Sequence, residues 1–77
     1  MSERFNIVPM VYAEDGDLYT SELRLLLFQV EGYAPTSIPF NDEDGIPAEA
    51  EATKVFMKSG CEYDILMPIT DFDQLFK

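Results

Sequence analysis

Residues 12–19 read Tyr-Ala-Glu-Asp-Gly-Asp-Leu-Tyr and place an Asp-Gly pair between two apolar segments. Asp and Gly both tolerate a positive φ, so this pair is typical of the centre of a tight β-hairpin turn. We therefore predict a hairpin that turns within residues 14–17. Its first strand is expected over residues 4–12 and its second over residues 18–30, because apolar side chains alternate in both segments.

The two predicted strands differ in how they are expected to sit in the sheet. Pro9 lacks a backbone donor, so the first strand is predicted to lie at an edge or to be bulged at that residue. The second strand carries the apolar run 25–28, which is typical of a strand covered on both faces. A helix over residues 21–30 is the alternative, because Ser21 and Glu22 suit a helix N-terminus.

The middle of the chain is interpreted as a long loop followed by a helix. Residues 31–45 combine prolines, glycines and the polar run 41–44, so we predict a loop there. Residues 47–59 are predicted to form the main helix, with glutamates early, lysines late and a glycine directly after it. The stripe that would pack this helix on the sheet consists of Ala48, Ala52, Val55, Phe56 and Ser59.

The end of the chain predicts one more strand and one more helix. Residues 61–67 alternate in polarity as a third strand does, and residues 71–76 suit a short helix that docks on the core. The predicted fold class is therefore α+β: a small three-stranded, mainly antiparallel sheet with one packed helix and a short C-terminal helix (β-β-α-β-α). With 77 residues, the chain is expected to form a single small acidic domain over residues 1–77.

Composition excludes most catalytic chemistry. The chain has no His and one Cys, Cys61, which removes the commonest general base, any internal disulfide and a cysteine zinc site. We therefore predict that the protein is not an enzyme and uses no cofactor and no metal. Cysteine usage and the lack of an apolar signal segment favour the cytoplasm.

A calcium-responsive module is one alternative to this metal-free interpretation. Asp42, Asp44, Gly45 and Glu51 match four positions of a calcium-loop pattern. The first ligand position of that pattern falls on Phe40, which has no oxygen to offer a cation. We therefore favour an ordinary solvated turn at this place.

The net charge points to the kind of partner. Fifteen Asp and Glu against five Lys and Arg give a formal net charge of −10. Such a chain repels nucleic acids and anionic membranes and attracts basic protein surfaces. We predict a partner with a basic surface, such as a nucleic-acid-binding protein, with no direct binding to nucleic acid or membrane. The alternative is that the acidity serves solubility alone, and a homodimer is left open.

The candidate partner-binding residues are grouped acids together with two aromatic anchors. The acids are Glu14, Asp15, Asp17, Asp42, Glu43, Asp44, Glu62 and Asp64. The aromatic candidates are Tyr12 and Tyr33, because exposed ion pairs contribute little without a desolvated anchor beside them. The two acids of the predicted third strand qualify only if the outer face of the sheet is open.

In size, negative charge and lack of catalytic groups, the chain resembles small acidic phage-encoded inhibitors, including anti-CRISPR and DNA-mimic proteins. The resemblance covers no aligned motif. It implies an inhibitor that blocks the basic, nucleic-acid-binding surface of a partner protein. The alternative from another class is a non-catalytic structural or assembly subunit that uses the Pro9 strand edge or an uncovered sheet face.

Overall fold

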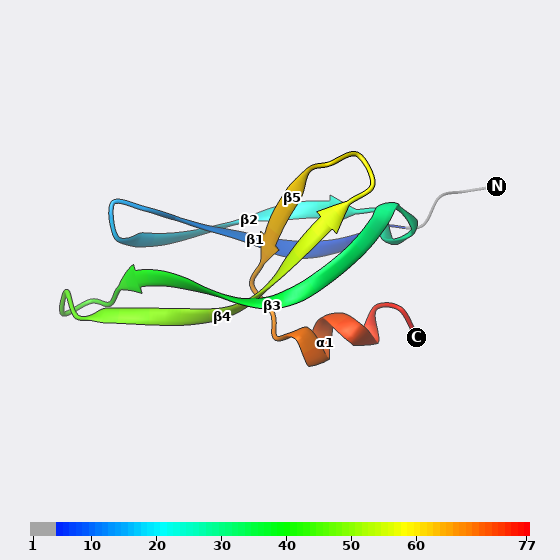
Figure 1. The fold of residues 1–77 in the computed structure, drawn as a ribbon. Helices are drawn as coiled ribbons and strands as arrows, with labels where there is room; N and C mark the ends of the chain where they lie inside the picture. The colour runs from blue at the N-terminus through cyan, green and yellow to red at the C-terminus, as the bar shows by residue number, and fades with distance from the viewer. Residues whose placement is uncertain (1–4) are drawn as a thin grey trace.

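Two long β-hairpins and one short strand form a single antiparallel sheet in the computed structural model, which describes residues 5–77 (Figure 1). The strands are β1 (Asn6–Glu14), β2 (Asp17–Leu25), β3 (Val30–Asn41), β4 (Pro47–Met57) and β5 (Glu62–Ile65). A 3-10 turn, η1 (Leu27–Gln29), joins the hairpins, and the helix α1 (Ile69–Gln74) ends the chain. The spatial order is β2-β1-β5-β4-β3, and the molecule is elongated, 49 × 20 × 20 Å.

The first hairpin forms at the Asp-Gly pair, as predicted. Asp15 and Gly16 have φ values of 54° and 84°, which is the pair of positive φ angles that a type I′ turn requires. The turn sets the register of the whole hairpin, from Glu14 opposite Asp17 to Asn6 opposite Leu25. The second strand ends at Leu25 and lies at the outer edge of the sheet, so the prediction of a strand over residues 18–30 covered on both faces is wrong in its extent and its place. The alternative helix over residues 21–30 is wrong too, because only the turn η1 follows the strand.

The prediction that Pro9 marks an edge strand is wrong, because β1 lies between β2 and β5. The carbonyl of Pro9 accepts the N–H of Leu66 at 2.8 Å, so this residue's backbone is directed toward the β5 side. On that side β1 pairs through one position alone, Met10 with Ile65. The N–H that Pro9 lacks would therefore point to β5, where the ladder consists of a single residue pair and no further hydrogen bond is lost.

The predicted loop over residues 31–45 is also wrong, because most of it forms β3. This strand is the outer edge of the sheet and pairs with β4 alone. Asn41 directs its N–H away from β4 to the carbonyl of Gly16, at 2.7 Å. Pro35 and Pro39 lie an even number of residues before Asn41, so their backbone nitrogens face the same way, away from β4. The missing donors of both prolines therefore lie on the open side, where no ladder is lost.

The predicted main helix over residues 47–59 is wrong as well, because the segment forms β4. Alanine and glutamate favour helices in isolation, but here they alternate, with Ala48, Ala50 and Ala52 on one face. Ala52 is fully buried in a cluster with Val11 and Ile38. Burial against the other hairpin therefore overrides the local helix propensity.

These differences correct the fold class. The three-stranded sheet with a packed main helix is replaced by five antiparallel strands and one short helix. The two elements predicted at the end of the chain are present, as β5 (Glu62–Ile65) and α1 (Ile69–Gln74). Sheet and helix are thus both present, but residues 47–57 belong to the sheet and only α1 is an α-helix among residues 5–77.

Two apolar cores lie on opposite faces of the twisted sheet. The larger core is under α1, and its buried members are Val8, Leu25, Val55, Ile65 and Phe72. The smaller core lies where the two hairpins face each other, with Val11, Ile38 and Ala52 as its buried members. Ala52 and Val55 are an odd number of residues apart in β4, so their side chains leave the sheet on opposite faces. The sheet is therefore covered on different faces at its two ends.

Gly16 is expected to tolerate alanine less well than Gly45 does. Both glycines have a positive φ, but a Cβ on Gly16 would lie 2.6 Å from the side-chain nitrogen of Asn41, whereas Gly45 has open space around it. We expect Gly45→Ala to lower the free energy of unfolding by about 1 kcal/mol and Gly16→Ala by about 2 kcal/mol. Urea unfolding of both variants measures the difference, and equal losses would show that the approach of Asn41 adds no cost.

Candidate functional site

The two acidic turns lie side by side at one end of the molecule, although about 27 residues separate them in the chain. The backbone bond from Asn41 to Gly16 joins the end of β3 directly to the β1–β2 turn. We call this region the acidic end and define it by six exposed carboxylates: Glu14, Asp15, Asp17, Asp42, Glu43 and Asp44. The structure thus brings together two of the predicted acidic groups.

The acids of the β3–β4 turn are of two kinds. The carboxylate of Asp42 accepts the N–H groups of Asp44 and Ile46, each at 2.9 Å, and so holds the turn closed. Within residues 5–77, Glu43 and Asp44 make no side-chain hydrogen bond and no ion pair. Asp42 therefore shapes the turn, while its two neighbours leave their carboxylates available to a partner.

The β1–β2 turn places like charges opposite each other. Glu14 and Asp17 are cross-strand partners at the end of the hairpin. Two carboxylates in this arrangement repel each other and destabilise the strand pair. Asp15 adds a third negative charge in the turn itself. The acidic end thus holds three negative charges in and beside one tight turn, which a basic partner would offset.

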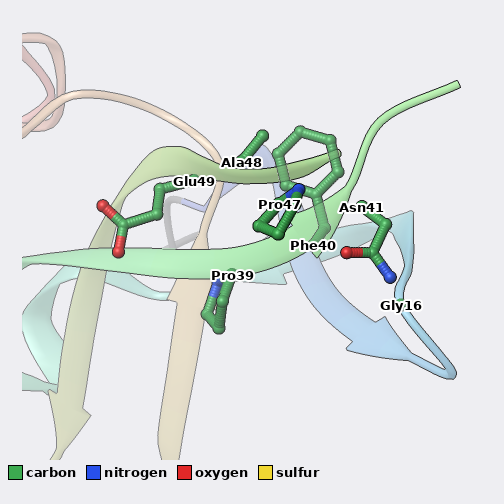
Figure 2. A pocket seen from close by; sticks show the side chains of 7 residues that line it. All are labelled: Gly16, Pro39, Phe40, Asn41, Pro47, Ala48 and Glu49. Atoms are coloured by element: carbon green, nitrogen blue, oxygen red, sulfur yellow. The ribbon is translucent and has the colours of Figure 1, made fainter. Parts of the chain in front are cut away.

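An apolar depression lies between the two turns. It has a volume of about 460 Å³ and is lined by Gly16, Pro39, Phe40, Asn41, Pro47, Ala48 and Glu49. Figure 2 shows the ring of Phe40 beside Pro47, with Asn41 directed toward the β1–β2 turn. A partner side chain that reaches this depression would lie among carbon atoms with carboxylates around it. Such a centre-and-rim arrangement is common in protein–protein interfaces.

A pair of tyrosines lies along the first hairpin on the face that carries Glu14 and Asp17, opposite to the face of Val11. Tyr12 and Tyr19 are cross-strand partners with ring centroids 5.5 Å apart and an interplanar angle of 22°. Both side chains remain exposed, by 46% and 43%. Tyr12 is thus exposed, and its stacked neighbour Tyr19 is not among the site residues predicted from the sequence. Counting outward from the Asp-Gly turn pairs the two tyrosines, so the signal was present in the sequence.

Tyr33, the other aromatic candidate, lies at the opposite end. Its hydroxyl donates to Oδ1 of Asp73 at 2.5 Å, and its ring packs on Phe72 and Phe76 with centroids 4.8 and 5.4 Å away. The hydrogen bond to the Asp73 carboxylate raises the pKa of Tyr33, and burial and the negative charge of Asp73 add to the effect. The structure therefore places Tyr33 in the contact that attaches α1 to the sheet.

Glu62 and Asp64 are also remote from the acidic end and already have a cationic neighbour. Nζ of Lys54 lies 3.2 Å from Oδ1 of Asp64 and 3.9 Å from Oε1 of Glu62. Lys54 and Asp64 are cross-strand partners in β4 and β5, so the pair is built into the register. A partner's lysine or arginine would have to displace Lys54 from Glu62 and Asp64. These two acids are therefore poorer ligands for a basic partner than Glu43 and Asp44 are.

Within residues 5–77, no group of three or more His, Cys, Asp or Glu side chains is arranged to hold a metal ion. The same part of the chain contains no helix of the length and apolarity needed to cross a membrane. No known family model, curated protein or solved structure matches the chain. Its function is therefore inferred from its charges and from the surfaces that the sheet leaves open.

Alkaline pH is expected to release α1 through Tyr33. Because its pKa is raised in the folded state, the tyrosine stabilises the fold fully below its ordinary pKa of about 10. Above that pH the unfolded chain loses its proton first, and the stabilisation falls. Tyr33→Phe should therefore reduce the fall in unfolding free energy that the wild type shows as pH rises from about 8 to about 11. Tyr12→Phe is the control, and equal slopes for both variants would contradict the assignment.

Glu14→Lys is expected to stabilise the protein. The change converts a repulsive cross-strand pair with Asp17 into an attractive one, which is worth about 0.5 kcal/mol. Glu31→Lys changes the net charge equally, but Glu31 lies at the register shift between Val30 and Gly32 and has no cross-strand partner. Thermal unfolding at low salt should rank Glu14→Lys above Glu31→Lys, with a smaller difference at high salt. Equal melting temperatures at low salt would show that only general repulsion was relieved.

Proposed function

We propose that this chain is a small acidic protein-binding module that inhibits a partner by covering its basic, nucleic-acid-binding surface. One observation carries the proposal: two turns that are distant in sequence hold six exposed carboxylates at one end of a rigid sheet. A surface of this kind attracts a basic groove over a distance and favours rapid encounter. We place this inhibitor in the cytoplasm, a host cytoplasm if it is phage-encoded.

Affinity has to come from more than charge, because exposed ion pairs contribute little on their own. The stacked pair of Tyr12 and Tyr19 supplies apolar area that a partner can desolvate. Tyr12 lies two residues from Glu14, a distance of about 6.8 Å along the strand. Anchor and charge thus lie close enough to contact one partner surface together.

The mimicry of nucleic acid finds support on β4 as well. Glu49 and Glu51 are both exposed and share one face of that strand, with a spacing of about 6.8 Å. They continue the negative surface from the β3–β4 turn along the sheet. A row of carboxylates at regular spacing on a rigid strand can stand in for backbone phosphates in a groove rich in Lys and Arg. Competition with duplex DNA or RNA is the direct consequence of this arrangement.

The proposal is tested by reversing charges that have no structural role. Glu43→Lys with Asp44→Lys leaves the Asp42 bonds of the turn in place. The matched control, Glu31→Lys with Asp71→Lys, makes the same change in net charge at exposed positions outside the acidic end. The wild type and the two variants are each used to capture partners from a nuclease-treated lysate. Captured proteins are eluted by salt steps and identified by mass spectrometry.

We expect the wild type and the control to capture a nucleic-acid-binding protein that elutes as salt rises and is displaced by added DNA or RNA. The Glu43/Asp44 variant should bind that protein about tenfold more weakly, because the steering charges are reversed. Equal capture by both variants would exclude the β3–β4 turn from the site. Failure of nucleic acid to displace the captured protein would exclude mimicry.

A structural or assembly subunit is the second candidate, and the open edge of β2 is the observation that favours it. The first strand cannot serve as that edge, since β1 lies inside the sheet. Binding through backbone ladders and apolar contacts would survive high salt, whereas the inhibitor's encounter weakens with salt. Capture of only its own copies, or of salt-resistant assembly proteins, would favour this candidate.

A further inference from the structure

The two edges of the sheet are unequal. On the β3 edge, Pro35 and Pro39 have no N–H to offer, and the N–H of Asn41 is already bound to Gly16. On the β2 edge there is no proline in any of nine residues. The β3 edge is therefore the poorer template for a further strand, and the β2 edge is the better one.

The register shows which backbone groups of β2 face outward. In a hairpin with a two-residue turn, the residues that flank the turn exchange hydrogen bonds, so Asp17 faces Glu14. The alternate residues Thr20, Glu22 and Arg24 then direct their N–H and C=O groups away from β1. Within residues 5–77, no backbone hydrogen bond outside the β1 ladder reaches them, and their side chains are exposed. This is the template that strand addition uses.

The side chains on both faces of this edge suit an incoming strand. One face presents the exposed ring of Tyr19, stacked on Tyr12. On the other face lies a depression of about 520 Å³ to which Ile7 and Pro9 contribute, together with Thr20 and Glu22 of the edge itself. Successive side chains of an added strand alternate between the faces, so they would meet the tyrosine pair and this depression in turn.

We propose that an extended, basic segment of the partner protein adds to β2 as a sixth strand. The inference deepens the proposed function, on which the choice of a basic guest rests. The net charge of −10 disfavours a second copy of the chain and favours Lys and Arg in the guest. A basic side chain opposite Glu22 lies on the depression side, and an apolar one beside Tyr19 lies on the other. The guest is therefore a strand that alternates basic and apolar residues.

The matched test introduces a proline to remove one outward N–H, as Pro35 and Pro39 do on β3. Thr20→Pro removes one outward N–H of β2 and leaves the ladder to β1 intact. Ser37→Pro removes an outward N–H of β3, between Pro35 and Pro39, and serves as the control. The probe is a capped ten-residue peptide that alternates Lys and Val. Binding is measured by fluorescence anisotropy, and amide hydrogen exchange of the wild type is followed with and without the peptide.

We expect the peptide to slow exchange at the amides of Thr20, Glu22 and Arg24. Thr20→Pro should weaken binding about tenfold, and Ser37→Pro should leave it unchanged. Should Thr20→Pro fail to fold, the exchange pattern of the wild type still decides the matter. Equal binding to Thr20→Pro, protection confined to other amides, or no binding at all would overturn strand addition.

Three further outcomes would overturn parts of this inference without deciding the proposed function. Binding that Glu43→Lys with Asp44→Lys abolishes, but Thr20→Pro does not, overturns strand addition and leaves an inhibitor that acts through its turns. Protection of the same β2 amides in the absence of peptide, with a dimer in sedimentation, overturns the basic guest in favour of a second copy. An alternating Glu–Val peptide that binds equally well also overturns the basic chemistry.

Discussion

The short strand β5 is the constraint on which the rest of the molecule depends. Its residue Ile65 pairs with Met10 of one hairpin and with Thr53 of the other, and it is fully buried. A two-stranded hairpin is marginally stable alone in water, so neither half is expected to persist without this connection. Thr53 is buried beside it and donates its hydroxyl to the carbonyl of Met67, at 2.9 Å. The hairpins meet again at their tips, through Gly16 and Asn41.

The two hairpins are joined by β5 and, at their turns, by the bond from Asn41 to Gly16, and this brings the two acidic turns side by side. The acids of each turn are local features of the sequence, yet their convergence follows from the path of β3 and β4 past the first hairpin (Figure 1). Like-charge repulsion is already present within the first turn, between Glu14 and Asp17, and the second acidic turn adds to it. Lower stability of the free protein and attraction to a basic partner are both expected under the binding role that we propose for the acidic end.

The sequence was informative where local chemistry alone decides the structure. The Asp-Gly turn, the short strand β5 and the short helix α1 could be predicted because each depends on a few adjacent residues. The strands β3 and β4 could not, because proline at an edge and alanine in a strand are permitted only by their neighbours. Ala52 is buried against Val11, some forty residues earlier in the chain, and no local pattern reports that contact. Among the site residues, the turn acids converge, whereas Tyr33, Glu62 and Asp64 have partners elsewhere.

The prolines of β3 also limit how far the sheet can grow. Open-ended polymerisation requires two complementary edges, one on each side of every subunit, so that each new copy offers the next a place to add. Here Pro35 and Pro39 each lack a donor on the outer side of β3, which weakens one of those edges. Association through β2 is therefore expected to favour a single step, with one guest strand or one closed pair. A chain in which 47% of the residues are hydrophobic thus has one open sheet edge and a lower tendency to form filaments.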